Sequence, residues 1–313
     1  MLKTAPLTSN REGFGVGVVE AGKNDPNVVV LTADLSESTC VEDFQKAFPD
    51  RFIQVGVAEQ NLAGIAAGMA LAGKVPFMTS YGVFSPGRNW DQIRISICYS
   101  KANVKIIGSH GGLATGRDGA THQALEDIAL TRVLPNMTVI VPCDYDEARK
   151  ATLAAARVHG PVYIRLCREK TPTLTSPTDD FEIGKAQILK QGEKVTLVGC
   201  GPILANALEA AIELEEQGIS CEVINCSTIK PLDEKTLLAS ARKTGKVITI
   251  EDHQIIGGLG SAVAELLSET FPVKMKRLGM RDKFGESGTY EELLHKYEMD
   301  PSAIKKAIIE ILL

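Results

Sequence analysis

The stretch "RFIQVGVAEQNLAGIAAGMALAGKVPFMTS", residues 51–80, has the pattern of a complete strand, helix and strand. The short apolar runs at its two ends, residues 51–56 and 74–80, have the length and composition of buried strands. Between them, after the "EQN" at residues 59–61, every side chain is small or apolar, which favours a helix packed on a sheet. Because parallel strands need such crossovers, the stretch indicates an α/β fold with a parallel sheet.

The same pattern recurs along the chain. Further strands are expected at residues 27–34, 103–109, 137–144 and 160–168, and further helices at 88–99 and 145–159. The proline- and threonine-rich "EKTPTLTSPTDD", residues 169–180, is typical of a linker. A second series follows, with strands at 194–201, 220–227 and 246–252 and helices at 203–217, 233–243 and 259–270, and helical patterns from 290 and 301 close the chain. We therefore expect two doubly wound α/β domains, residues 1–172 and 185–313, joined by a linker over 173–184.

Composition excludes several classes of function. The chain has 313 residues and a net charge of −5, so no bulk basicity suggests nucleic-acid binding. No secretory leader pattern and no apolar run long enough to cross a membrane are present. Seven cysteines, without a CxxC pair, predict reduced thiols in a cytoplasmic protein, with neither a disulfide framework nor a zinc site. We expect no nucleic acid, no membrane and no metal held by this chain.

Candidate site residues follow the predicted strands. Ligands of open parallel sheets bind beyond the carboxyl ends of the strands. The unusual polar and aromatic residues at these places, with Arg11 at the head of the first helix, are Asp34, Ser38, Glu59, Tyr81, Phe84, Arg88, His110, Asp118, His122 and Arg168. The sequence therefore predicts a site that several strand ends build together.

The loop "SHGGLATGRDGATHQ", residues 109–123, is the most informative of these segments. It holds four glycines, which permit positive φ angles and close approach to a ligand. Two of the five histidines of the chain, His110 and His122, lie in it together with Asp118. A long glycine-rich loop with clustered histidines at a strand end is more often part of a functional site than a surface loop whose histidines only face solvent.

Each candidate also has an ordinary structural explanation. Glu59, taken alone, suits a helix N-terminus, where the dipole favours an acid by about 0.3–1 kcal/mol. Tyr81 and Phe84 could be core aromatics, and arginines are usually surface charges. The "GGLG" at 257–260 lacks the full G-x-G-x-x-G pattern and does not predict a nucleotide site. His253, in "EDHQ", could be a loop residue that packs against the other domain.

Three segments together resemble the transketolase family over nearly the whole chain. They are "GVAEQNLAGIAAGMAL", "DGATHQALEDIALTRVLPNMTVIVPCD" and "GPVYIRLCR". Thiamine diphosphate enzymes hold the diphosphate and its metal with a GDG sequence and a later asparagine, but this chain has only "RDG" at 117–119. The chain thus resembles the C-terminal subunit of a split transketolase. The resemblance implies an N-terminal partner subunit that holds the diphosphate and Mg²⁺, self-association to a dimer, and a heterotetramer.

The resemblance also implies how the cofactor is held. Glu59 matches the glutamate that hydrogen-bonds N1′ of the aminopyrimidine of thiamine diphosphate. This role needs a carboxyl group that can keep a proton, and an apolar surrounding favours the neutral form of an acid. Tyr81 and Phe84 match aromatic residues that pack on the pyrimidine ring, and Asp34 and Leu35 match a segment that lines the cofactor.

The remaining residues match the substrate site of the family. His110, Asp118 and His122 match residues that hold sugar hydroxyls and the donor carbonyl region, and His122 is the candidate for proton transfer. Arg11, Ser38 and Arg168 match a clamp on the sugar phosphate, a task for which the planar guanidinium fork is suited. The implied catalytic residues are Glu59, His110 and His122. The implied reaction transfers a two-carbon ketol group from a ketose phosphate, such as xylulose 5-phosphate, to an aldose phosphate, such as ribose 5-phosphate, in the pentose phosphate pathway.

Other readings stay open at this point. A 1-deoxy-D-xylulose-5-phosphate synthase shares the "DG-THQ" pattern, although that enzyme is usually one long chain. The β subunit of a 2-oxoacid dehydrogenase has the GxAEQ helix but as a rule lacks the DGxTHQ loop. A non-catalytic partner of the same fold is a third possibility, because fold alone does not establish function. Ala120, where proline is usual, and Arg117, where an acid is common, are departures that bear on substrate preference.

Overall fold

The strand–helix–strand unit of residues 51–80 forms as predicted in the computed structural model, which describes residues 5–313. It consists of β3 (Phe52–Gln54), α3 (Glu59–Leu71) and β4 (Val75–Tyr81). Both strands run parallel to β2 (Val28–Thr32) and lie on either side of it. The unit is therefore a crossover that passes over one strand of a parallel sheet.

The first sheet has seven strands in the order β12-β6-β7-β5-β4-β2-β3. Six of them are parallel, and three of these complete the predicted series: β5 (Lys105–Ser109), β6 (Thr138–Ile140) and β7 (Val162–Arg165). The seventh, β12 (Thr228–Lys230), comes from the second half of the chain and pairs antiparallel with β6. The sequence did not predict this strand, because three residues carry no periodic signal.

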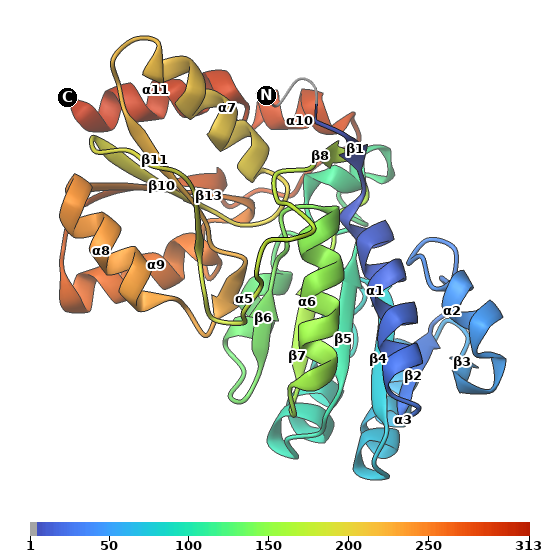
Figure 1. Cartoon of the computed structure of the whole chain (residues 1–313). Helices are drawn as coiled ribbons and strands as arrows, with labels where there is room; N and C mark the ends of the chain where they lie inside the picture. The colour runs from blue at the N-terminus through green and yellow to red at the C-terminus, as the bar shows by residue number, and fades with distance from the viewer. Residues whose placement is uncertain (1–4) are drawn as a thin grey trace.

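Helices cover both faces of this sheet (Figure 1). On one face lie α1 (Asn10–Asn24) and α6 (Tyr145–Arg157). The two helices pack so closely at Gly13 that a Cβ there would lie 2.1 Å from the Tyr145 carbonyl oxygen. On the other lie α3 and a helical segment of α4 (Trp90–Gln92) continued by a π-helical turn (Ile93–Tyr99). Two short helices, α2 (Glu42–Ala47) and α5 (Asp127–Arg132), complete the layer structure.

The second sheet has five strands in the order β14-β13-β10-β11-β9. Its strands are β9 (Gln187–Lys190), β10 (Val195–Gly199), β11 (Cys221–Asn225), β13 (Lys246–Gln254) and β14 (Lys274–Met280). All are parallel except β9, an edge strand that pairs antiparallel with β11. Neither β9 nor the opposite edge strand, β14, was predicted from the sequence. Figure 1 shows α7 (Leu204–Glu215) and α11 (Pro301–Leu312) on one face, and α8 (Glu234–Thr244) and α9 (Leu259–Thr270) on the other. The prediction of two doubly wound α/β units is confirmed.

The two units are packed against each other. Within the first unit, β1 (Leu7–Thr8) pairs with β8 (Thr171–Pro172), which joins the two ends of that unit. Leu113 and Leu125, from the glycine-rich loop region of the first unit, belong to the apolar core of the second. Of the seven cysteines, all are free, and six are buried. No helix within residues 5–313 is long and apolar enough to cross a membrane.

Candidate active site

Four aromatic and imidazole side chains meet beyond the carboxyl ends of β4 and β5. The rings of Tyr81 and His110 are stacked, with centroids 3.8 Å apart. The Phe84 ring lies 5.8 Å from Tyr81 and nearly parallel to it, and the His122 ring meets Phe84 edge-on at 5.5 Å. We call these four residues the ring cluster. The structure thus brings together residues that the sequence placed after separate strands.

His110 is the buried member of the ring cluster. It follows β5 directly, has a positive φ of 58°, and its Nδ1 lies 2.9 Å from the Ser109 hydroxyl. Burial lowers its pKa to about 3, and the charges of Arg11, Arg168 and His122 act in the same direction. The imidazole is therefore neutral near pH 7 and can donate or accept a hydrogen bond.

Glu59 is the first residue of α3 and is only 2 % exposed. Its Oε2 accepts a hydrogen bond from Arg88 Nη1 at 2.7 Å, and the Arg88 guanidinium in turn lies 4.7 Å from the centre of the Phe84 ring. The expectation of a lone acid in purely apolar surroundings is thus wrong, because the described structure pairs Glu59 with a cation. The sequence gives Arg88 no role of its own; its one signal is an arginine four residues after Phe84, at the end of "SYGVFSPGR".

Arg11 and Ser38 are in direct contact. Arg11 Nη1 donates to the Ser38 carbonyl oxygen at 2.7 Å, and its buried Nε has no hydrogen-bond partner among the described residues. Asp34 and Leu35 lie in the loop after β2, where their amides donate to side chains of Gln54 and Thr32. Asp34 is exposed, and Leu35 is half-buried. These hydrogen bonds keep the segment close to its own strands.

Asp118 and Arg168 form an ion pair at the rim of the site. Arg168 Nη1 lies 3.1 Å from Asp118 Oδ2 and also donates to the Thr115 carbonyl oxygen at 3.1 Å. Both charged side chains are about 40 % exposed, so water screens the pair and it contributes little to stability. A hollow beside them is lined from the first unit by residues 116–118, 168 and 169 and from the second by Gly288, Thr289 and Tyr290.

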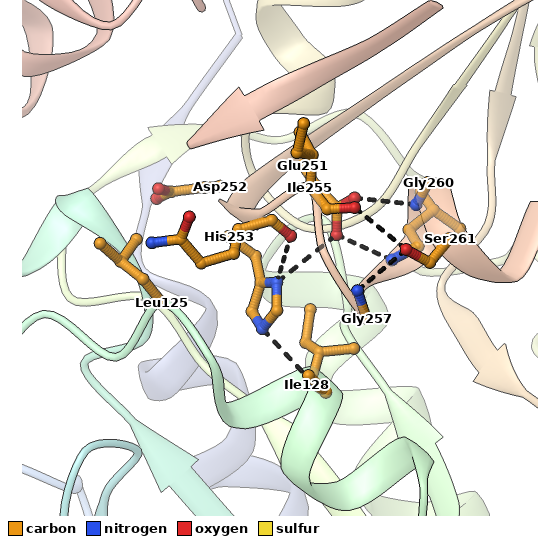
Figure 2. Close-up of polar contacts among 12 residues, drawn as sticks. Leu125, Ile128, Glu251, Asp252, His253, Ile255, Gly257, Gly260 and Ser261 are labelled. Carbon is orange, nitrogen blue, oxygen red and sulfur yellow. Dashed lines mark hydrogen bonds and ion pairs between the residues drawn. The ribbon is translucent and has the colours of Figure 1, made fainter. Parts of the chain in front are cut away.

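The glycines at 257–260 do not form a phosphate site. The Glu251 carboxylate accepts hydrogen bonds from the amides of Leu259 and Gly260, at 2.7 and 2.8 Å, and so occupies the N-terminus of α9 (Figure 2). A Cβ at Gly258 would lie 1.9 Å from the same carboxylate, so the glycine is needed for packing. His253 is a fully buried residue of β13, not a loop residue, and it packs against the first unit as expected.

Two family models match this chain. They are "Transketolase, pyrimidine binding domain", over residues 8–173, and "Transketolase, C-terminal domain", over residues 184–304. The chain belongs to the transketolase family. Membership makes it a subunit of the transferase class, and the family implies thiamine diphosphate as cofactor, whose pyrimidine end belongs to the first domain.

Relatives of the transketolase chain include separate subunits of similar length. A Methanocaldococcus jannaschii protein, named as a transketolase C-terminal section, is 46 % identical over 303 residues, covering 96 % of this chain and 95 % of that one. A 6-deoxy-6-sulfo-D-fructose transketolase subunit of Clostridium sp. (strain MSTE9) is 43 % identical, covering 94 % and 91 %. A solved split gene transketolase, described as an inactive beta4 tetramer, superimposes with a TM-score of 0.91 at 49 % identity, covering 97 % and 98 %.

Proposed function

We propose that this chain is one subunit of a two-chain transketolase, which transfers a two-carbon ketol group from a ketose phosphate to an aldose phosphate. The observation that carries the proposal is the ring cluster, with a buried carboxylate paired to the arginine beside its Phe84 ring, and with the positive charges of Arg11 and Arg168 acting on His110. A partly exposed cluster of stacked and edge-on rings suits a heteroaromatic cofactor, and the arginines suit a phosphate. Both features lie beyond the strand ends of the domain that the family assigns to the pyrimidine.

The residues present fit the pyrimidine end of thiamine diphosphate. Glu59 is buried, yet the Arg88 that pairs with it is 51 % exposed, so the pair can open without leaving a buried cation. Glu59 would then hold a proton at the N1′ nitrogen, while Tyr81 and Phe84 would pack on the ring. Asp34 and Leu35 would line the cofactor from the loop after β2. Thiamine diphosphate, when bound, supplies the carbon centre that takes up and releases the ketol group.

The sugar phosphate would lie across the other half of the ring cluster. Arg11, Ser38 and Arg168 would hold its phosphate, and the unpartnered Nε of Arg11 is a free donor for it. Asp118 and the neutral His110 would hold hydroxyl groups. His122, which is partly exposed, would transfer protons to and from the substrate oxygen.

The residues that bind the diphosphate of the cofactor and Mg²⁺ would come from an N-terminal partner subunit. Within residues 5–313 no group of three or more histidine, cysteine, aspartate or glutamate side chains could hold a metal ion. The names of the relatives, a C-terminal section, a subunit and a split gene product, support a partner. On α3, added Cβ atoms at Gly64 and Gly68 would meet nothing within 4 Å, which leaves a face open for self-association. We propose a heterotetramer, and the free cysteines support a cytoplasmic location.

The reaction is tested with the reconstituted complex. The chain is co-expressed with a GDG-containing transketolase N-terminal subunit and supplied with thiamine diphosphate, Mg²⁺, xylulose 5-phosphate and ribose 5-phosphate. Seven-carbon and three-carbon sugar phosphates are expected as products. Because one relative is named for a sulfonated sugar, 6-deoxy-6-sulfo-D-fructose is tested as an alternative donor. A complex that binds the cofactor but transfers no ketol group from either donor would contradict the proposal.

A further inference from the structure

The loop that carries the candidate substrate residues, His110 to His122, is bound at both ends by the second unit. We call it the substrate loop. Near its start, the Leu113 amide donates to Asp252 Oδ1 at 2.9 Å, and Asp252 is only 6 % exposed. The contact is tight, because a Cβ at Gly112 would lie 2.2 Å from Asp252 Oδ2. Asp252 belongs to β13, so a strand of the C-terminal unit fixes the backbone of this loop.

Gln123, directly after the loop, forms the second connection. Its Nε2 donates to the Gly116 carbonyl oxygen at 3.2 Å and to the Glu286 carbonyl oxygen at 2.9 Å. Gly116 lies inside the substrate loop, whereas Glu286 lies before α10 (Tyr290–Lys296) in the second unit. The Gln123 side chain is 3 % exposed, so water cannot easily replace these hydrogen bonds.

The carboxyl end of β13 is itself anchored in the first unit. Arg165 of β7 donates to the carbonyl oxygens of Asp252 and Ala124, at 2.8 and 2.9 Å. His253 Nδ1 lies 2.7 Å from the Gln254 carbonyl oxygen, and its Nε2 accepts from the Ala129 amide at 3.4 Å (Figure 2). These hydrogen bonds keep Asp252 in a fixed place relative to the first sheet.

We propose that Asp252 and Gln123 are positioning residues, through which the C-terminal unit holds the substrate loop in the geometry that binds the sugar phosphate. Neither side chain needs to touch the substrate, because each acts on the loop backbone that carries Asp118 and His122. The inference rests on the proposed function, since it assigns the substrate to this loop. It gives the C-terminal unit a part in substrate binding beyond the rim residues at 288–290.

The test compares variants of two matched carboxylates in the full chain assembled with its partner. Asp252→Ala removes the acceptor for Leu113, and Asp252→Asn retains one. The control is Asp233→Ala, because Asp233 lies in the same unit, is 7 % exposed and also accepts from backbone amides, those of Thr236 and Ala186. Gln123→Met keeps the side-chain length but removes the donor. Amide hydrogen exchange over residues 110–122, the KM for the sugar phosphate and the cofactor affinity are measured.

We expect faster exchange in the substrate loop and an approximately tenfold higher KM for Asp252→Ala and Gln123→Met, with cofactor affinity unchanged. Asp252→Asn should keep the exchange rate of the substrate loop and the KM close to their wild-type values. Asp233→Ala should change neither the exchange rate nor the KM. If Asp252→Ala does not fold, Gln123→Met alone decides. Equal exchange in wild type and Gln123→Met, or faster exchange with an unchanged KM, would overturn the inference. Exchange is also measured without substrate, so it reports on the loop even if the complex transfers no ketol group.

Discussion

Glu59 is buried although its position in the helix would suit an exposed acid. A carboxylate that only caps a helix gains about 0.3–1 kcal/mol and has no reason to leave water. Taking it out of water costs several kcal/mol, which a single half-exposed arginine offsets only in part. A residue kept in such a place is a candidate for function, and its proximity to the ring cluster through Arg88 points to the cofactor.

Replacing Glu59 by glutamine tests this role. The amide keeps the size and a hydrogen bond but cannot exchange a proton, so the ketol-transfer rate of the assembled complex should fall about 100-fold or more. Exchange of the C2 proton of bound thiamine diphosphate, followed by NMR, is the direct measurement. Arg88→Gln is the companion variant, and its ketol-transfer rate should fall far less than that of Glu59→Gln. Unchanged proton exchange in Glu59→Gln would remove Glu59 from its proposed role.

Arg168 provides a second prediction for a single residue. Lysine keeps the charge but lacks the planar fork, so Arg168→Lys should raise the KM for sugar phosphates about tenfold and leave kcat less affected. The matched control is Arg157→Lys at the exposed end of α6. Steady-state kinetics on the assembled complex distinguish the two. If both substitutions left the KM at its wild-type value, the proposal that Arg168 binds the sugar phosphate would be wrong.

The sequence predicted the members of the site better than their partners. The rule that ligands bind beyond the carboxyl ends of parallel strands selected Tyr81 and His110 as site residues, and the structure stacks their rings. It could not predict that Arg88 pairs with Glu59, because the two are 29 residues apart and no local pattern links them. Asp252 is still more remote, 139 residues from Leu113, and only the packing of the two units brings them together.

At the scale of the element, the end of β13 and the start of α9 form one closed polar unit. Burial raises the pKa of Glu251 to about 7 and lowers that of His253 to about 4. The amides of α9 bind Glu251, and the neutral His253 accepts from Ala129. A glycine cluster that suggested an open loop therefore serves packing and internal hydrogen bonding.

His253 should make stability depend on pH. Its pKa in the folded chain lies below the ordinary value of 6.5, so the unfolded chain binds the proton more readily between those values. The free energy of unfolding should therefore fall as the pH drops from 7 to 5, by about 2 kcal/mol more in wild type than in His253→Gln. Urea unfolding at both pH values measures this difference, and the opposite effect of Glu251 is shared by the two proteins. Equal losses in both would contradict a neutral buried His253.

The open face of α3 gives a prediction about assembly. Gly64→Arg places a side chain into space that is empty in the single chain, and arginine favours a helix over glycine by about 0.8 kcal/mol. The variant should keep or raise its thermal stability as a monomer, yet self-associate more weakly in sedimentation experiments. Unchanged association at equal protein concentration would place the self-association surface elsewhere.

For the whole molecule, the two-unit α/β architecture could be predicted because buried parallel strands and covering helices each have a periodic signal. The short edge strands β12 and β9 could not, since they run antiparallel to their only neighbours. The edge strand β14 could not either, because its sequence "KMKRLGM" is too rich in cations to resemble a buried strand. The contact between the units could not be predicted either, because it depends on side chains such as Asp252 and Arg165 that have no local signature. That contact nevertheless shapes the candidate site.

The central claim is that this chain holds one part of a transketolase site and needs a partner for the rest. The most direct measurement adds a GDG-containing N-terminal subunit in steps to a fixed amount of this chain, with thiamine diphosphate and Mg²⁺, and records ketol transfer at each step. We predict no activity for the chain alone and a linear rise that saturates at an equimolar ratio. Full activity of the isolated chain, or none at any ratio, would contradict the account.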